Sequence, residues 1–243
     1  MATWTTLLSL RQLNTQLISR QQFQLFSSVV LLMPMTTATG ITDVKGKVTT
    51  NAGATLSTSV NDPFGQNVGV FSFPGGVSGA RISVAQSADF AFGSGSFSIE
   101  FWAYPTAAIT GVLSGLFDTR AVFGDNGWDF SLNANNQVYV NALSSFVGDE
   151  SSGLVLPIGS WSYFCISRDA TTGLNRMSVN GFSLTSNYSR NNSILAPGNL
   201  IVGDIINTAS PYDGSFTGYM SNLRITRVYR DGSIVPTAAF PTS

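Results

Sequence analysis

Short runs of alternating apolar and polar residues recur along most of the chain, separated by clusters of Gly, Asn, Asp and Ser. A period of two is typical of a strand with one buried face, because successive side chains point to opposite faces. Residues 97–105 are the clearest case, with Phe97, Ile99 and Phe101 on one face before Pro105 ends the run. From residue 29 onward the pattern predicts strands throughout and no long helix.

Turn signals between these runs predict which strands are neighbours. Asn180-Gly181 is the strongest two-residue hairpin turn in the chain, and Asn135-Asn136 is a second candidate turn. The predicted hairpins join 128–132 to 137–140, 161–168 to 176–179, and 176–179 to 182–184. Residues 216–228 are expected to form one or two late strands near the centre of the sheet. The alternation predicts a core that contains Phe97, Ile99, Phe101, Phe130, Phe164, Ile166, Val179 and Leu223.

Residues 1–28 differ from the rest of the chain, and we divide the protein into this N-terminal arm and a β-domain of residues 29–243. The arm has two arginines and no acidic residue, and its leucines are spaced as in a short amphipathic helix. We expect it to pack on partner subunits, whereas packing on its own domain is the alternative. The partner-binding residues are predicted to be Trp4, Leu7, Leu10, Arg11, Leu13, Leu17, Arg20 and Phe23.

The composition is poor in charge and rich in hydroxyl and amide groups. Charged residues make up 10% of the 243 residues, the net charge is −1, and Ser, Thr and Asn number 32, 23 and 17. This balance offers no electrostatic attraction for nucleic acid. The chain has only two Lys and two Glu, the residue types that are most depleted in protein interfaces. Such a low number suggests a surface largely covered by neighbours, as in a homo-oligomer. A hydroxyl-rich surface that is merely uncharged is the alternative.

Several chemistries are excluded by residue types that the chain lacks. It has no His, so it has no imidazole base, no Ser-His-Asp triad and no His-ligated zinc. The single cysteine, Cys165, lies in an apolar strand-like run and is interpreted as an inert core thiol. The longest apolar stretch near the N-terminus is far shorter than the ~20 residues of a membrane span. We therefore expect no membrane insertion and, with no signal-peptide pattern at the N-terminus, synthesis in a host cytoplasm.

An ordered set of motifs resembles a known superfamily. The motifs are F-S-I-E-F-W-A-Y-P (97–105), G-W-D-F-S-L-N-A-N-N-Q-V-Y-V (127–140), W-S-Y-F-C-I-S-R-D (161–169), R-M-S-V-N-G (176–181) and F-T-G-Y-M-S-N-L-R-I-T (216–226). Together they resemble the concanavalin A-like lectin/glucanase superfamily in its laminin-G-like or pentraxin-like branch, over residues 29–243. The resemblance implies an all-β, antiparallel jelly-roll sandwich. It implies no particular activity, because this fold hosts lectins, glycosidases and structural modules.

Relatives of this fold carry glycosidase sites or calcium sites, and each kind of site needs particular residues. Glycosidases of this fold need two carboxylates about 5–5.5 Å apart, and Glu100 stands alone on its strand, so we predict no enzymatic activity and no catalytic residues. Calcium would need Asp and Asn oxygens, which could come from Asp125, Asn126, Asp129, Asp204 and Asp213. The same residues are ordinary turn formers, so we predict no cofactor and no metal, with calcium as the open alternative.

Sugar binding requires an exposed aromatic ring beside polar groups. The glycan-binding candidates are Trp128, Tyr188, Tyr212 and Asp213. Near the C-terminus Arg224, Arg227 and Arg230 are expected to form separate ion pairs or to contact a neighbouring subunit.

Two functional hypotheses follow. The composition and the arm resemble those of bacteriophage structural proteins with laminin-G-like domains, which indicates a virion protein, in particular a capsid decoration or cement protein that clamps the major capsid protein or other virion subunits. The alternative is a tail-fibre or tail-knob adhesin that binds host glycans.

Overall fold

The computed structural model describes residues 26–76, 79–109, 113–122, 125–141, 151–186, 193–206 and 213–243. The predicted arm residues, from Trp4 to Phe23, lie outside this part of the chain. The division into an arm and a β-domain, and the role of the arm, therefore stay predictions.

Strands account for nearly all regular structure in the described ranges, together with one short 3-10 turn at Ala88–Phe90. The strands are β1 (Val29–Met33), β2 (Thr49–Ala52), β3 (Thr55–Ser57), β4 (Val70–Gly76), β5 (Arg81–Val84), β6 (Phe97–Pro105), β7 (Leu113–Asp118), β8 (Asp129–Asn133), β9 (Gln137–Asn141), β10 (Ser151–Val155), β11 (Ser162–Asp169), β12 (Leu174–Val179), β13 (Phe182–Ser186), β14 (Leu200–Val202) and β15 (Asp213–Thr226). Within these ranges no helix has the length and hydropathy that crossing a membrane would require.

The predicted hairpins are confirmed. β8 pairs with β9, β11 with β12, and β12 with β13, all antiparallel. Asn180 and Gly181 have φ values of 50° and 82°, the left-handed pair that a two-residue hairpin turn needs. Pro105 ends β6 as expected.

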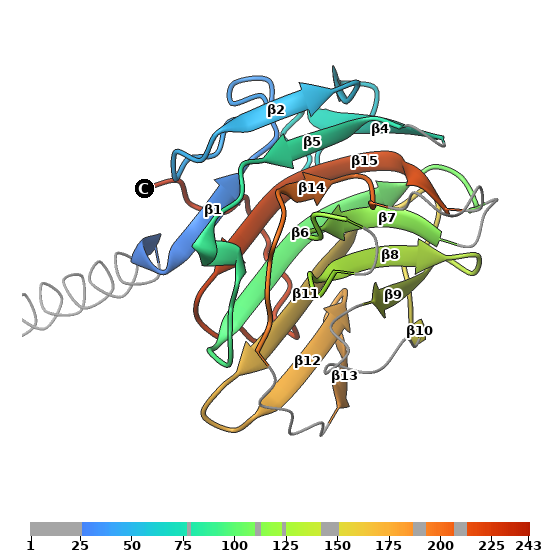
Figure 1. The fold of residues 1–243 in the computed structure, drawn as a ribbon. Helices are drawn as coiled ribbons and strands as arrows, with labels where there is room; N and C mark the ends of the chain where they lie inside the picture. The colour runs from blue at the N-terminus through green and yellow to red at the C-terminus, as the bar shows by residue number, and fades with distance from the viewer. Residues whose placement is uncertain are drawn as a thin grey trace, which may run out of the picture.

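The strands form two packed layers joined through β15, as expected for a jelly-roll sandwich. The main order is β10-β9-β8-β7-β15-β6-β11-β12-β13; β1, β4 and β3 attach to the β15 side, and β14, β5 and β2 to the β7 side. In Figure 1, β7, β8 and β9 lie over β6, β11 and β12. The pairing is antiparallel with one exception among the described strands: residues 213–215 of β15 run parallel to 113–115 of β7.

Aromatic side chains from the two layers meet in the main core. Phe101 on β6 has its ring centroid 4.6 Å from Phe117 on β7, and Phe130 on β8 lies 6.1 Å from Phe164 on β11. All the side chains predicted from alternation to be core are buried, none more than 5% exposed. The core prediction is confirmed.

A β-bulge in β15 keeps its apolar residues on the core side. The register against β6 shifts between Ser221 and Arg224, and Asn222 within the shift has φ 53°. Because the extra residue reverses the alternation, Met220 and Leu223 both face the main core although their numbers differ in parity. The same step places Arg224 on the outer face, opposite Glu100.

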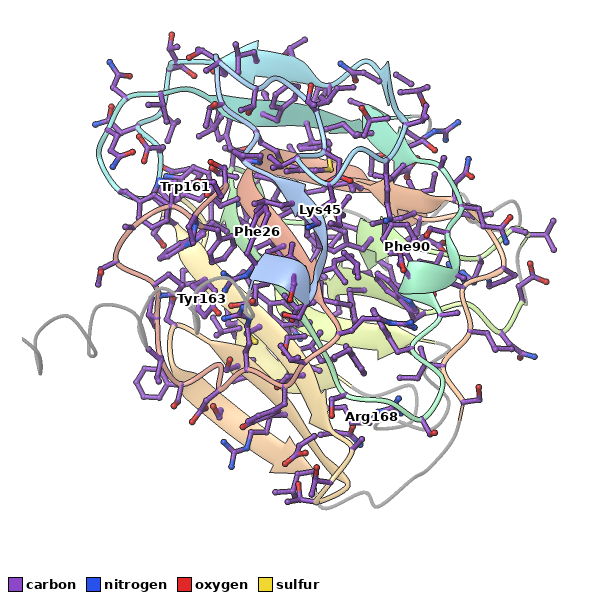
Figure 2. All side chains as sticks on the ribbon, turned by 90° about the vertical axis from the view of Figure 1, so that its left-hand side faces the viewer. Phe26, Lys45, Phe90, Trp161, Tyr163 and Arg168 are labelled. Carbon is purple, nitrogen blue, oxygen red and sulfur yellow. The ribbon has the colours of Figure 1, made fainter. Side chains whose placement is uncertain are left out.

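The outer face of β6 and β11 carries a second, smaller apolar cluster. Trp102, which the alternation places away from the main core, is only 8% exposed. Figure 2 shows this side of the molecule, with Phe26, Trp161 and Tyr163 on it. The buried members are Val29, Leu32, Trp102, Tyr163, Cys165 and Phe240, and the half-buried ones are Phe26, Val44, Phe64, Trp161 and Val235.

Replacement of Phe101 by Ala is expected to lower the free energy of unfolding by about 3–5 kcal/mol, because it leaves a cavity between the two layers. Urea denaturation followed by tryptophan fluorescence would measure the loss. A loss below about 1 kcal/mol would contradict the placement of this ring in the core.

Candidate functional site

Glu100 is an ion-pair partner buried within the outer cluster. Its carboxylate is 2% exposed and receives hydrogen bonds from Arg224 Nε (2.8 Å), Arg224 Nη2 (2.7 Å) and the Tyr163 hydroxyl (2.7 Å). Arg230 Nε lies 3.4 Å from the same carboxylate. With both oxygens engaged and almost no exposed surface, Glu100 has the environment of a structural residue.

The three C-terminal arginines differ from the expectation of separate ion pairs. Arg224 and Arg230 share one carboxylate, because the bulge and the turn after β15 direct both toward Glu100. Arg227 instead donates through Nη2 to the carbonyl of Ala91 at 2.6 Å.

Burial shifts the pKa values of three groups near Glu100. Burial raises the pKa of Cys165, and the charge of Glu100 raises it further. Burial likewise raises the pKa of Tyr163. Burial lowers the pKa of Arg230, and the nearby Arg224 adds to the effect. The prediction of an inert core thiol agrees with the position of Cys165, which is 1% exposed.

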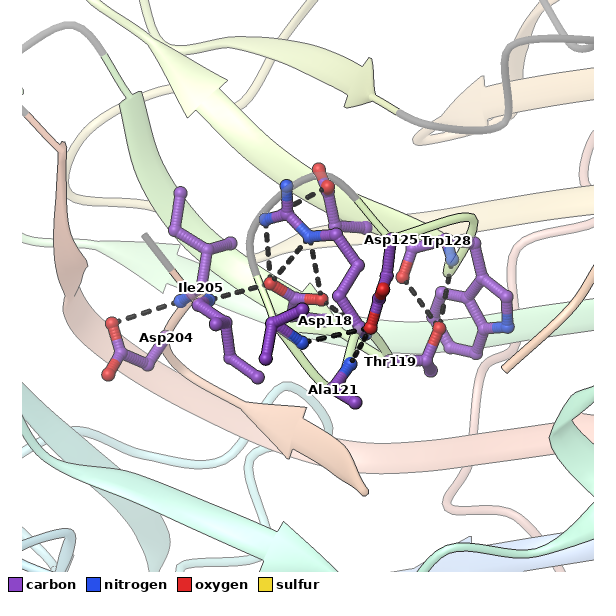
Figure 3. A network of polar contacts seen from close by, with 11 residues as sticks. Asp118, Thr119, Ala121, Asp125, Trp128, Asp204 and Ile205 are labelled. Carbon is purple, nitrogen blue, oxygen red and sulfur yellow. Dashed lines mark hydrogen bonds and ion pairs between the residues drawn. The ribbon is translucent and has the colours of Figure 1, made fainter. Parts of the chain in front are cut away.

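A second buried polar network lies where β7 and β8 meet (Figure 3). Arg120 Nη2 is 2.7 Å from Asp118 Oδ2 and 3.1 Å from Asp129 Oδ2, and all three residues are at most 3% exposed. Asp118 also accepts the amides of Arg120 (2.7 Å) and Ile206 (2.6 Å). The guanidinium therefore lies between the two carboxylates, in the position where a metal cation would otherwise bind.

Asp125 and Asp204, which were also considered for calcium, are engaged as well, whereas the side chain of Asp213 lies outside the described residues. Asp125 accepts the amides of Ala121 and Val122, at 3.0 and 2.9 Å, as a turn former does. Asp204 accepts from Ser215 Oγ and the amide of Ile205, both at 2.9 Å. Burial raises the pKa of Asp204, although these hydrogen bonds lower it. In the described ranges no three His, Cys, Asp or Glu side chains come together as a metal site.

The prediction of Trp128 as a sugar-stacking residue is wrong. Its ring is 1% exposed, lies 5.4 Å from Phe130, and donates through Nε1 to the carbonyl of Phe90 at 3.0 Å. Trp128 directly precedes β8, and its indole points into the main core, so neither face of the ring is available to a sugar. The other candidates, Tyr188 and Tyr212, lie outside the described residues, as does the side chain of Asp213.

A different aromatic set gathers on the outer surface. Tyr104 on β6 lies between Trp161, just before β11, and Tyr219 on β15; the centroid distances are 5.5 and 5.9 Å. We refer to these three residues as the aromatic row. Tyr104 and Tyr219 are register partners, and all three side chains are half-buried. The row could not be predicted from the sequence, because its members are far apart in the chain. The one signal is the alternation in β6, which places Tyr104 on the outer face.

Polar loop residues fix the ends of the row. Trp161 Nε1 donates to the carbonyl of Asn61 at 2.7 Å, and the Tyr219 hydroxyl lies 3.1 Å from Ser59 Oγ. Asn61 and Ser59 are exposed. Rings held in place by their polar atoms lose little entropy when a ligand packs on them. The row is thus a preorganised aromatic surface bordered by hydroxyl and amide groups.

Two curved layers joined by one long strand define a lectin-type β-sandwich. The chain belongs to the concanavalin A-like lectin/glucanases superfamily, whose family model matches residues 76–238. A search of the curated proteins found no match.

Solved structures share this fold at low sequence identity. One is of botulinum neurotoxin type C, whose cell entry is described as dependent on two ganglioside molecules (16% identity, TM-score 0.61). Another is the binding domain of Paraclostridial Mosquitocidal Protein 1 (13%, 0.60), and a third the binding domain of botulinum neurotoxin DC with rat synaptotagmin II (15%, 0.59). The matches cover 85–86% of this chain but only 50–51% of theirs, so the chain spans about half their length.

Replacement of Glu100 by Gln is expected to lower the free energy of unfolding by about 3–5 kcal/mol, because it leaves the buried Arg224 without a counter-charge. Chemical denaturation would measure this loss. A matched change, Asp231→Asn, removes the partner of the half-exposed Arg176 and should cost at most about 1 kcal/mol. Equal losses in the two variants would contradict a structural role for Glu100.

Calcium at millimolar concentration is expected to leave the melting temperature unchanged, because Asp118 and Asp129 are already paired with the buried Arg120. Differential scanning fluorimetry with calcium, with magnesium and with a chelator would test this. A rise of several degrees with calcium alone would show a site that these contacts do not reveal.

Proposed function

We propose that the protein is a non-catalytic, lectin-like binding module that recognises glycans through the aromatic row. The observation that carries the proposal is the alignment of Tyr104, Trp161 and Tyr219 across three neighbouring strands. Sugar rings have apolar faces that pack on aromatic side chains, and their hydroxyls need the donors and acceptors that border this row.

The acidic residues support a binding role rather than hydrolysis. Glycoside hydrolysis needs one carboxylic acid and one carboxylate facing the substrate. Glu100 is closed off by Arg224 and Tyr163, and Asp118 and Asp129 are held by Arg120. None of these three carboxylates has exposed surface to offer a sugar.

The similar structures support a binding function. Two of them are described as binding domains, and one is described through an interaction with gangliosides, which carry sugars. Their identity to this chain is 16% or less, so they support the fold, and the choice of ligand rests on the row itself.

Replacement of Trp161 by Ala is expected to weaken glycan binding about tenfold or more, because an aromatic residue at the centre of contact commonly contributes more than 1.4 kcal/mol. A glycan array with the labelled protein would find the ligand, and calorimetry on the best one would give the dissociation constants.

Phe182→Ala is the matched control. Phe182 is an aromatic residue on β13, 78% exposed and outside the row, so its removal should leave the affinity unchanged. Equal losses in both variants, or an array without any bound glycan, would contradict the proposal.

The composition favours a second candidate, the virion structural protein. A chain with only 10% charged residues fits a subunit whose surface is covered by neighbours, and the arm of residues 1–28 would attach the domain to the capsid. The two candidates are compatible, because a virion protein can present a glycan-binding surface.

Deletion of residues 1–25 tests this second candidate and leaves the contacts of Phe26 and Ser28 with the β-domain in place. The truncated chain is expected to keep a melting temperature near that of the full chain and to fail to join the particle, because the arm adds contact area on its neighbours. Thermal denaturation and co-sedimentation with particles would measure both. Normal assembly of the truncated protein would contradict the role of the arm.

A further inference from the structure

The aromatic row continues across two more strands as a polar surface. Tyr219 is the register partner of Ser72 on β4, and Ser72 is the partner of Thr55 on β3. Ser72 is half-buried and Thr55 is exposed. Residues at paired positions share a face, so the outer surface runs without interruption from Trp161 to Thr55.

A depression of about 480 Å³ opens beside the polar end of this surface. Its walls are small residues from the turn between β2 and β3, the end of β4 and the start of β5. Pro74, one of them, is two positions beyond Ser72 on the same face of β4, or about 7 Å away. The depression and the aromatic row are therefore neighbouring parts of one surface.

Two glycines in these walls have no room for a side chain. A Cβ atom on Gly75 would overlap Thr217 Oγ1, and one on Gly79 would overlap the side chain of Ser215. Gly75 also has φ 74°, which side chains other than glycine's rarely adopt. The hollow is thus a consequence of how β4, β5 and β15 pack, and it lies within the usual volume range of small-molecule sites.

Among the described residues that line the depression, Arg81 alone is charged. Its side chain is 50% exposed, and Nη1 lies 3.3 Å from Asp204 Oδ2. Asp204 is itself held by Ser215 and by the amide of Ile205. The buried carboxylate thereby orients the guanidinium from one side, while its other donors have no partner among the described residues. A fork of parallel N–H groups is suited to a carboxylate, which it binds through two hydrogen bonds.

We infer that this depression is the acidic-sugar subsite of the proposed glycan-binding surface, with Arg81 bound to the carboxylate of a uronic or similar sugar acid. The inference rests on the proposed function and names its ligand class. The aromatic row would hold neighbouring sugar units of the same chain, since it begins about 5 Å from β4, at Tyr219, and ends about 15 Å from β4, at Trp161.

Two matched probes test the inference: an oligogalacturonide and its fully methyl-esterified, uncharged form, titrated into the full chain by calorimetry. The acid is expected to bind at least tenfold more tightly than the ester at low salt, with the difference shrinking as salt is added. Arg81→Gln should bring the two dissociation constants to within twofold of each other, and Arg81→Lys should restore part of the preference.

Arg176→Gln is the control, since this arginine lies on β12 with Asp231 as its partner and is expected to leave both affinities unchanged. A preference for the acid that survives in Arg81→Gln would overturn the inference, as would equal binding of both probes by the unaltered protein.

A glycan array of the unaltered chain and Arg81→Gln separates the two proposals. Bound glycans without any acidic preference would contradict the subsite alone, whereas the absence of every glycan signal would contradict the proposed function and the subsite with it. Loss of acidic glycans alone in Arg81→Gln, with an unchanged melting temperature, would support both.

Discussion

The bulge at Asn222 is the constraint on which both faces of this sandwich depend. β15 must place Met220 and Leu223 in the main core, and Tyr219 and Arg224 on the outside. A strictly alternating strand cannot do this, because each pair differs in parity. One extra residue reverses the alternation, so that the core stays apolar, Arg224 reaches Glu100, and Tyr219 remains beside Tyr104. A single local irregularity thus links packing, the buried ion pair and the aromatic row.

Local patterns in the sequence were sufficient for part of the strands, namely β6, β8, β9, β11, β12, β13 and β15, and for much of the core. Alternation identified the buried face of β6, and Asn180-Gly181 identified a hairpin, because both depend on residues close together in the chain. The outer cluster could not be predicted, since it is completed by Phe240, more than 130 residues after Trp102. The aromatic row could not be predicted either, because Tyr104, Trp161 and Tyr219 are far apart in the chain. Trp128 was misplaced because aromatic side chains serve equally in cores and in binding surfaces.

The two buried arginine networks show how a chain with few charges uses them. Arg120 pairs with two carboxylates at the β7–β8 junction, and Arg224 pairs with Glu100 on the outer face of β6. Removal of charge from water is costly unless the charged groups are paired and hydrogen-bonded, as they are in both networks. Much of the surface is left to hydroxyl and amide groups, with Arg81 and the Arg176–Asp231 pair among the partly exposed charges. Such a surface suits ligands that are themselves rich in hydroxyls.

The burial of Cys165 has a consequence for following the protein in solution. The thiol is 1% exposed, its Cβ lies beneath Gly232, and burial keeps it protonated. Thiol reagents act on the thiolate, so modification must wait until the segment around Gly232 lifts from β11. Because the chain has no second cysteine, the rate at which Cys165 is alkylated measures how often the outer face opens, and the measurement needs no ligand.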